Sequence, residues 1–426
     1  MPHLSRRAAL FGIAGSAALS LPGCGRAQPL SERSSAGAFP RVQALIDGYI
    51  RKRKLAGISA ALSARSAPTA FLNAGTLAFD ADAPARPDSL YRLYSMTKPV
   101  TGFAAMLCVE DGRLSLDQPI ADFIPEFASM RVLGENGASA PARTQITPRH
   151  LLTHTAGFTY HFFGTPLAER YLDAGISPDG PTPILGADRT PPPQTLDEFG
   201  ARLAAMPLDF EPGTRWQYSL GLDLLALVIQ RASGLTYEQF LTARLFAPLG
   251  MADTAFYVAP EKVARLTTNY GFEDNGEVVV VDDRAASPYA TPSMPCGGAG
   301  LVSSAADYAR FSAMLRNGGE LDGTRVAATA TVDAARSNLL PRSVDITQSG
   351  LDGGHYGAGL RVVTAASAVT GEEPAGSFGW SGAAGTQVWV DPANQAFAVL
   401  MTQFMPFDTY PLSTEFRNAF YADIAA

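Results

Sequence analysis

Several residue types are scarce in this chain of 426 residues, and each scarcity excludes a class of protein. The three cysteines, Cys24, Cys108 and Cys296, are too few for a disulfide scaffold or a four-cysteine zinc site. Charged residues make up only 17% of the chain and leave a formal net charge of −7, so no cationic field attracts nucleic acid. With 46% hydrophobic residues, the composition predicts a folded protein without a nucleic-acid partner.

Lysine is the rarer of the two basic residues, since only four of the 33 Lys and Arg residues are lysines. One of these, Lys98, stands at the start of an apolar segment that runs from Val100 to Leu107. A buried lysine can lose its proton, whereas an arginine in a protein cannot. A lysine at this position of an arginine-rich chain therefore indicates a chemical role.

The N-terminal residues 1–27 have the features of an export signal. The pair Arg6-Arg7 precedes an uncharged, mostly apolar stretch at 8–21, which is too short to span a bilayer and resembles the twin-arginine export pattern. Two endings fit: a lipobox that makes Cys24 a lipidated N-terminus, or cleavage after Ala27 that leaves Gln28 first. We expect export to a bacterial periplasm, with membrane contact only through a lipid on Cys24.

For the rest of the chain we predict a Ser-rich tether at 28–39 and a single catalytic domain at 40–426, since large catalytic domains reach this length. Strand patterns near both chain ends, with helices between them, predict an α/β fold of the α+β type, whose antiparallel sheet is built from both ends and flanked by helices. The sheet lobe is expected at about 40–90 and 300–426, and a mostly helical lobe at about 100–295. The expected strands are 57–64, 68–78, 387–390 and 396–401, and the expected helices begin near 40 and 95 and cover 221–233, 236–247, 304–317 and 411–424.

Ser95 stands three residues before Lys98, and this spacing places both on one face of a helix. The Ser95 hydroxyl and the Lys98 amine can therefore meet. At a helix start, free backbone N–H groups can also hold a developing oxyanion. The pair predicts a serine nucleophile that a neutral lysine deprotonates.

Further motifs follow in an order and spacing that make coincidence improbable. The motifs are Ser95-Met96-Thr97-Lys98, His150-Leu151-Leu152-Thr153-His154-Thr155-Ala156-Gly157, Phe210-Glu211-Pro212-Gly213, Tyr218-Ser219-Leu220-Gly221, Gly298-Ala299-Gly300-Leu301-Val302-Ser303-Ser304 and Gly379-Trp380-Ser381-Gly382. Together they resemble the serine β-lactamase-like superfamily, and within it the class C β-lactamase-related carboxylesterases of family VIII, over about 41–405.

The resemblance implies the roles of the catalytic residues. Ser95 corresponds to the nucleophile, Lys98 to the lysine of the same motif, and Tyr218 to the tyrosine that shares proton transfer with it. The backbone N–H groups of Ser95 and Ala383 would form the oxyanion hole. Whether Lys98 or Tyr218 is the principal base stays open at this point.

The same resemblance assigns substrate binding to Trp380, Ser381, Gly382 and Leu220, in a cleft between the two lobes. Two of them depart from the penicillin-recognising pattern. Leu220 replaces the Asn of Tyr-x-Asn, and Trp380 replaces a cationic residue that could pair with the carboxylate of a β-lactam. Both changes make the expected cleft more apolar and favour esters over β-lactams.

Other polar residues are expected to be structural. His150 and His154 have the i, i+4 spacing of zinc ligands but lack the accompanying glutamate, so we predict no metal site. Asp282, Asp283 and Asp322 are expected to be solvated in loops.

The sequence therefore predicts an exported serine carboxylesterase that hydrolyses short-chain or small-alcohol esters through an acyl-enzyme on Ser95. It needs no cofactor, and its partner is a small-molecule ester. One alternative is a β-lactamase, D-Ala peptidase or acyltransferase that uses the same site. Another, of a different class, is a non-catalytic cell-wall-binding module. The oligomeric state is left open.

Overall fold

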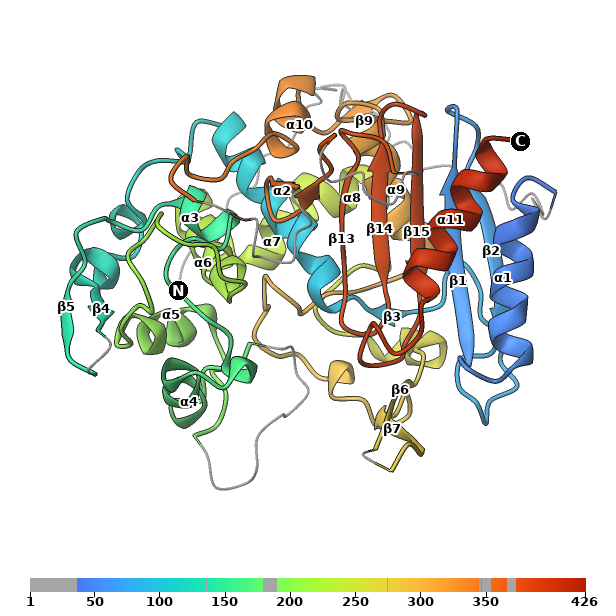
Figure 1. The fold of residues 1–426 in the computed structure, drawn as a ribbon, viewed down its shortest axis with the longest axis horizontal. Helices are drawn as coiled ribbons and strands as arrows, with labels where there is room; N and C mark the ends of the chain where they lie inside the picture. Colours follow the sequence, from blue (N-terminus) through green and yellow to red (C-terminus); the bar gives the residue numbers. More distant parts are fainter. Residues whose placement is uncertain are drawn as a thin grey trace, which may run out of the picture. The chain divides into compact units, whose positions relative to one another are not determined.

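Figure 1 shows the computed structural model, which describes residues 37–426 except 135–136, 179–189, 274, 345, 347–353 and 366–372. The predicted export signal at 1–27, with Cys24, and residues 28–36 of the predicted tether lie outside the described residues. Within the described part of the chain, none of the helices has the length and apolar character needed to cross a membrane.

Among the described residues, the main sheet has seven strands in the order β11-β12-β13-β14-β15-β1-β2, and every neighbouring pair is antiparallel. Two strands come from the N-terminal part of the chain and five from the C-terminal part, so the sheet joins both ends of the fold (Figure 1). The strands are β1 (Gly57–Ser63), β2 (Ala70–Gly75), β11 (His355–Tyr356), β12 (Arg361–Val362), β13 (Phe378–Ser381), β14 (Gln387–Asp391) and β15 (Ala396–Met401).

Helices cover both faces of this sheet. Helices α1 (Pro40–Arg51) and α11 (Leu412–Ile424) pack on one face, and α9 (Ala305–Arg316) packs on β15, β1 and β14 at the other. Strand β15 shows how the sequence serves both layers, because its side chains alternate between faces. Ala398 and Leu400 join the cluster under α1 and α11, whereas Phe397 and Val399 join the larger core that contains α9.

The middle of the chain is mostly helical, and α2 (Thr97–Glu110) packs against α6 (Gly221–Ser233) in its centre. The other α-helices are α3 (Pro148–Leu152), α4 (Pro166–Asp173), α5 (Leu196–Ala204), α7 (Tyr237–Leu241), α8 (Ala247–Leu249) and α10 (Thr329–Ala335), with a π-helical segment at Thr242–Phe246. Four two-stranded sheets complete the described part: β3 (Tyr91–Arg92) with β8 (Val302–Ser303), β4 (Arg131–Leu133) with β5 (Ser139–Pro141), β6 (Asn269–Phe272) with β7 (Val278–Asp282), and β9 (Glu320–Leu321) with β10 (Thr324–Arg325).

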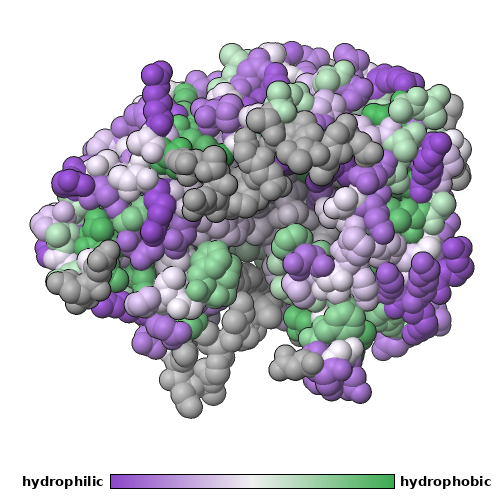
Figure 2. All heavy atoms as spheres, viewed as in Figure 1, coloured by the Kyte–Doolittle hydropathy of each residue, from purple (hydrophilic) through white to green (hydrophobic). Residues whose placement is uncertain are grey.

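The predicted fold class is confirmed, as is the expected hairpin near the C-terminus, which is formed by β14 and β15. The β6–β7 hairpin is unusual because most of its apolar side chains are exposed, whereas Tyr270 is buried. Phe272, Val278, Val280 and Val281 are all exposed, and an apolar patch is visible at this hairpin in Figure 2. The hydrophobic pattern of this short hairpin therefore does not indicate which of its side chains are buried.

Candidate active site

Ser95 lies on a sharp bend between a strand and a helix. Strand β3 ends at Arg92, the short 3₁₀ turn Tyr94–Met96 follows, and α2 begins at Thr97. The backbone of Tyr94 has φ of +46°, in the left-handed region that a residue with a side chain rarely adopts. This strained residue turns the chain so that Ser95 precedes the first turn of α2.

The structure brings the three predicted catalytic side chains together. The Lys98 ammonium donates a hydrogen bond to Ser95 Oγ over 3.1 Å, as the i, i+3 spacing predicts. The Tyr218 hydroxyl donates to the same oxygen over 2.8 Å, from the loop that leads into α6. Ser95 Oγ therefore lies within proton-transfer distance of both candidate bases.

Lys98 is fully buried, and its ammonium donates hydrogen bonds to neutral oxygens. Besides Ser95 Oγ, it donates to the carbonyl oxygen of Gly298 over 2.8 Å. Its Nζ also lies 4.7 Å from the ring centre of Tyr218 and 5.3 Å from that of Tyr160. Within the described part of the chain, Lys98 forms no ion pair. The contacts of Lys98 are therefore with a hydroxyl, a carbonyl and two aromatic rings.

Asp223 holds the backbone that Lys98 contacts. This fully buried carboxylate, on the first turn of α6, accepts the backbone N–H of Gly298 over 2.7 Å. A Cβ atom added at Gly298 would lie only 2.5 Å from Asp223 Oδ2, so a glycine is needed there. The sequence analysis did not identify Asp223, although a single carboxylate between Leu222 and Leu224 in an apolar helix was a usable signal.

His154 supports the segment that carries Tyr218. Its Nδ1 accepts the backbone N–H of Ser219 over 3.2 Å, so Nε2 carries the proton and donates to the Tyr356 hydroxyl over 3.1 Å. Burial, together with the charge of Lys98, lowers the pKa of His154 well below its usual range, so the imidazole is neutral. The His154 ring packs 4.7 Å from the Tyr218 ring and limits its movement.

His150 also has a structural place, in the first turn of α3. Its backbone N–H and its Nδ1 form a reciprocal cap with Thr147, at 3.4 Å and 3.3 Å. Burial lowers the pKa of His150 to about 4. Among the described residues, no group of three or more His, Cys, Asp or Glu side chains is arranged to hold a metal ion.

The segment after β13 passes close to the bend that carries Ser95. A Cβ atom at Gly382 would lie 2.2 Å from the carbonyl oxygen of Leu93, two residues before Ser95, so only glycine allows this approach. Ala383 follows directly and is partly exposed. In the described part of the structure its backbone N–H meets no protein acceptor, which leaves it available to an oxyanion.

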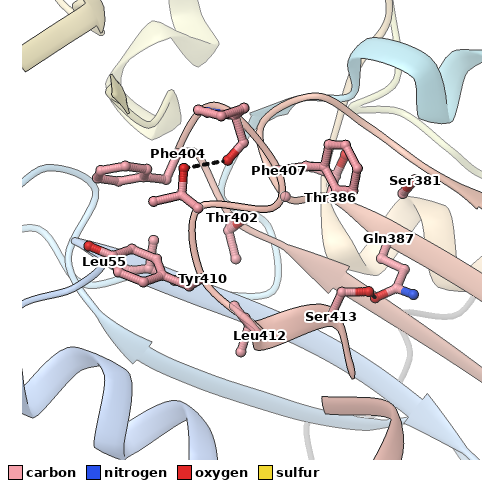
Figure 3. Close-up of a pocket in the computed structure, with 13 residues that line it drawn as sticks. Leu55, Ser381, Thr386, Gln387, Thr402, Phe404, Phe407, Tyr410, Leu412 and Ser413 are labelled. Carbon is pink, nitrogen blue, oxygen red and sulfur yellow. Dashed lines mark hydrogen bonds between the residues drawn. The ribbon is translucent and has the colours of Figure 1, made fainter. Parts of the chain in front are cut away.

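The four predicted substrate-binding residues have different surroundings. Trp380 is partly exposed, and its ring lies 5.8 Å from the ring of Tyr218, whose hydroxyl contacts Ser95 Oγ. Ser381, the next residue in β13, lines a different groove with Phe407, Gln387 and other residues of the C-terminal segment (Figure 3). Consecutive strand residues point to opposite faces, which explains this difference.

Leu220 requires a correction. Its side chain is fully buried in the main core cluster at the start of α6, so it has no surface for a substrate. The replacement of a polar residue by Leu220 extends the core under Tyr218 instead of lining the site. Gly382 is also buried, and it acts through its lack of a side chain.

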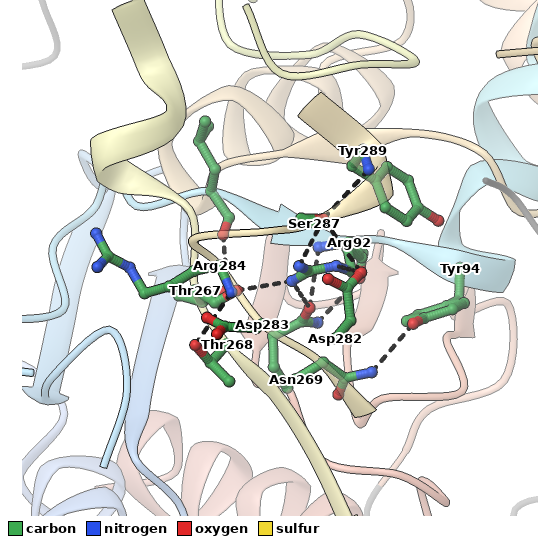
Figure 4. Close-up of polar contacts among 12 residues, drawn as sticks. Arg92, Tyr94, Thr267, Thr268, Asn269, Asp282, Asp283, Arg284, Ser287 and Tyr289 are labelled. Atoms are coloured by element: carbon green, nitrogen blue, oxygen red, sulfur yellow. Dashed lines mark hydrogen bonds and ion pairs between the residues drawn. The ribbon is translucent and has the colours of Figure 1, made fainter. Parts of the chain in front are cut away.

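The expectation of a solvated Asp282 is wrong. Figure 4 shows Asp282 inside a polar network, where its Oδ2 accepts a hydrogen bond from Arg92 Nε at 2.5 Å, and both side chains are almost completely buried. Arg92 also donates to the carbonyl oxygen of Thr267 over 2.7 Å and to Ser287 Oγ over 3.0 Å. This network fixes the β6–β7 hairpin to the strand that leads to Ser95.

The two other aspartates behave closer to the expectation. Asp283 is exposed, and its Oδ1 accepts the backbone N–H of Ala285 over 3.0 Å. The Asp322 side chain is 55% exposed and forms an ion pair of 2.7 Å with Arg310.

Comparisons with known proteins agree with this geometry. A family model described as Beta-lactamase matches residues 42–422. Esterase EstB of Burkholderia gladioli is 33% identical over 405 residues, which cover 91% of this chain and 96% of that protein. Acyltransferase calJ of Penicillium decumbens is 29% identical over 369 residues, or 80% of this chain and 82% of the relative.

A solved structure has the same fold. EstCE1, described as a hydrolase with promiscuous acyltransferase activity, superimposes with a TM-score of 0.74 at 24% sequence identity. The match covers 90% of this chain and 98% of EstCE1. The similarity therefore extends through almost the whole of both folds.

Proposed function

The chain belongs to the β-lactamase family of serine hydrolases and, from this premise, we propose that it cleaves carboxylic esters through an acyl-enzyme on Ser95. The observation that carries the proposal is the convergence of the Lys98 ammonium and the Tyr218 hydroxyl on Ser95 Oγ, at 3.1 Å and 2.8 Å. Activity as a serine ester hydrolase or acyltransferase agrees with the relatives, one named an esterase and one an acyltransferase.

In the first half of the reaction, Lys98 begins as the neutral amine, and Ser95 Oγ attacks the ester carbonyl carbon while its proton passes to the Lys98–Tyr218 pair. The backbone N–H groups of Ser95 and Ala383 donate to the negative carbonyl oxygen of the tetrahedral intermediate. When this intermediate collapses, the bond to the alcohol oxygen breaks. The alcohol leaves with the proton that the pair received, and the acyl group stays on Ser95.

In the second half, water loses a proton to the same pair and attacks the acyl carbon. The carboxylic acid leaves, and Ser95 Oγ recovers the proton. If a second alcohol replaces water, the product is a new ester, and the enzyme is an acyltransferase. The same residues serve both outcomes, so the relative access of water and alcohol decides between them.

Esters are favoured over β-lactams because of the walls of the site. Trp380 takes the place of a cation that would pair with a β-lactam carboxylate, and its ring lies against Tyr218. An uncharged ester needs no such charge partner. We therefore keep β-lactam or D-Ala peptide cleavage as the second candidate, and a catalytically silent cell-wall-binding module as the third.

One set of assays separates these candidates. The mature protein, Ser95→Ala and the control Ser381→Ala are tested with p-nitrophenyl acetate, p-nitrophenyl butyrate and nitrocefin. We expect ester turnover in the mature protein and in Ser381→Ala but not in Ser95→Ala, and a serine-directed phosphonate should label Ser95. Dominant nitrocefin turnover would favour the β-lactamase, no turnover of either would favour the binding module, and labelling of Ser381 would contradict the site.

We also propose that residues 1–27 direct export to the periplasm and that 28–39 form a tether to a catalytic domain at 40–426. The support is the Arg6-Arg7 pair followed by the uncharged stretch 8–21. Cell fractionation after replacement of both arginines by lysine tests export, which should be lost. Mass spectrometry of the mature N-terminus distinguishes a lipidated Cys24 from an unmodified Gln28.

A further inference from the structure

Two phenylalanines are exposed on a short 3₁₀ turn, His161–Phe163, on the helical side of the site. The Phe162 residue is 57% exposed and Phe163 46%. The Phe162 ring stacks on the buried Tyr160 ring, with centres 4.8 Å apart and planes within 14°, and the Phe163 ring lies 4.9 Å from Phe162. One face of this stack is therefore supported by the protein, while much of its surface meets water, which is unfavourable for rings of this size.

The stack, which we define as Tyr160, Phe162 and Phe163, is continuous with the catalytic side chains. The Tyr160 ring lies 5.2 Å from the Tyr218 ring and faces Lys98 Nζ at 5.3 Å. Aromatic rings thus extend from the groups that contact Ser95 Oγ to the surface. These rings offer a surface along which a flat, apolar part of a substrate can lie.

The chemistry of the proposed reaction decides which half of an ester lies there. The carbonyl oxygen points toward the Ala383 N–H, next to β13 and Trp380. The leaving oxygen must receive a proton from Tyr218 or Lys98, and Lys98 Nζ faces the rings of both Tyr218 and Tyr160. Within the described residues, Tyr160 and Trp380 both contact the Tyr218 ring but form no ring contact with each other. The alcohol half therefore extends away from β13, toward Tyr160.

We propose that the aromatic stack is the binding site for the alcohol half of the substrate, and that it selects esters of flat, aromatic alcohols such as phenols and naphthols. This inference rests on the proposed function, and it adds a substrate class to it. Phe162 is the specificity residue of this subsite, because its exposed ring supplies the contact area that an alkyl alcohol leaves unused.

Three activated esters test the inference: 2-naphthyl acetate has an aromatic alcohol, vinyl benzoate an aromatic acyl group, and vinyl acetate neither. In Phe162→Ala, we expect kcat/KM for 2-naphthyl acetate to fall about five- to tenfold, mainly through KM, as expected for the loss of one ring contact. The values for vinyl acetate and vinyl benzoate should change by no more than about twofold. Phe162→Trp should retain the activity on 2-naphthyl acetate.

Phe272→Ala is the matched control, because Phe272 is also exposed, at 41%, but lies on the β6–β7 hairpin. It should leave all three esters unaffected. A loss confined to vinyl benzoate, or an equal loss on all three esters, would overturn the assignment of the alcohol half. Thermal melting of each variant checks that the fold is unchanged.

Binding of 2-naphthol, measured by calorimetry, keeps the inference separate from the proposed function. If the wild-type protein hydrolyses none of the esters, the proposed function fails. The subsite still stands if 2-naphthol binds the wild-type protein several-fold more tightly than Phe162→Ala. Equal binding to the two proteins overturns it.

Discussion

Two fully buried cations lie six residues apart, and their surroundings differ in kind. Arg92 contacts the carboxylate of Asp282 at 2.5 Å and three further oxygen acceptors, whereas Lys98 contacts a hydroxyl, a carbonyl and two aromatic rings. An arginine keeps its charge in a protein, and the fold pairs Arg92 with a carboxylate. Lys98 is the proposed base, and among the described residues its contacts are with neutral groups. Burial of a charge thus marks structure in one case and chemistry in the other.

The strongest test of this contrast is to replace Lys98 by a residue whose charge, like that of Arg92, cannot be lost. In Lys98→Arg, the cation and its size are nearly kept, but the proton cannot be exchanged. We expect ester turnover to fall by about 10²- to 10⁴-fold, the usual contribution of proton transfer. Steady-state kinetics with p-nitrophenyl acetate measures this, and Lys262→Arg at the surface is the control. Full activity of Lys98→Arg would contradict any role of Lys98 in proton transfer.

The converse test removes the charge of Arg92. Arg92→Met leaves Asp282 buried without its cation, and we expect the free energy of unfolding to fall by about 3–5 kcal/mol. The double variant Arg92→Met, Asp282→Leu should be less destabilised, since it leaves no unpaired charge. Urea unfolding of both variants gives the comparison. If the single variant is as stable as the wild type, the ion pair does not hold the hairpin.

Asp307 extends the comparison to a buried anion. It stands on the first turn of α9 and accepts the backbone N–H of Asp253 over 2.6 Å, and burial is the main cause that raises its pKa from 3.8 to about 6. The folded chain therefore holds the proton of the Asp307 carboxyl more tightly than the unfolded chain does. The contribution of this proton to the free energy of unfolding is full below pH 4 and is lost as the pH rises through 6.

Asp307→Asn removes this loss. We compare the free energy of unfolding of the variant with that of the wild type. When the pH is raised from 4 to 8, this difference should shift in favour of the variant by about 1–3 kcal/mol. Urea unfolding at the two pH values measures the change. Asp322→Asn, at an exposed site, is the control, and a difference that is the same at both pH values would argue against a raised pKa of Asp307.

The smallest expected effect concerns the neutral partner of Lys98. Asp223→Ala releases the Gly298 peptide whose carbonyl contacts Lys98, and we expect kcat to fall about tenfold with little change in KM. Asp223→Asn keeps an oxygen for the Gly298 N–H and should recover most of the activity. If Asn is as damaging as Ala, the carboxylate acts through its charge rather than by holding Gly298.

Much of the site followed from local sequence patterns and from the resemblance. The i, i+3 spacing alone predicted that Ser95 and Lys98 meet, because helix geometry fixes that distance. Tyr218 was different, since 123 residues separate it from Ser95 and nothing local links them. Only the resemblance to a family suggested their meeting. Its roles for Ala383 and Trp380 stay predictions.

The Arg92–Asp282 pair shows what the sequence could not reveal. The two residues are 190 positions apart, and in β7 the valines are largely exposed while Asp282 at its end is buried. Hydrophobic patterning predicts buried valines and an exposed aspartate. The observed arrangement is the opposite because the network around Arg92, and not the hairpin itself, decides the burial of Asp282. Leu220 was misjudged for a related reason, since a motif position does not show which way its side chain faces.

The main chain forms part of the site, as at the close approach of Gly382 to Leu93, and this has a practical consequence for protein engineering. The Gly298 carbonyl that contacts Lys98 and the Ala383 N–H predicted to hold the oxyanion belong to the main chain, so substituting the side chain at either position does not remove them. Replacing the amide of Ala383 by an ester through chemical synthesis would remove its N–H donor while keeping every side chain. Backbone chemistry of this kind reaches a part of the site that the genetic code cannot alter directly.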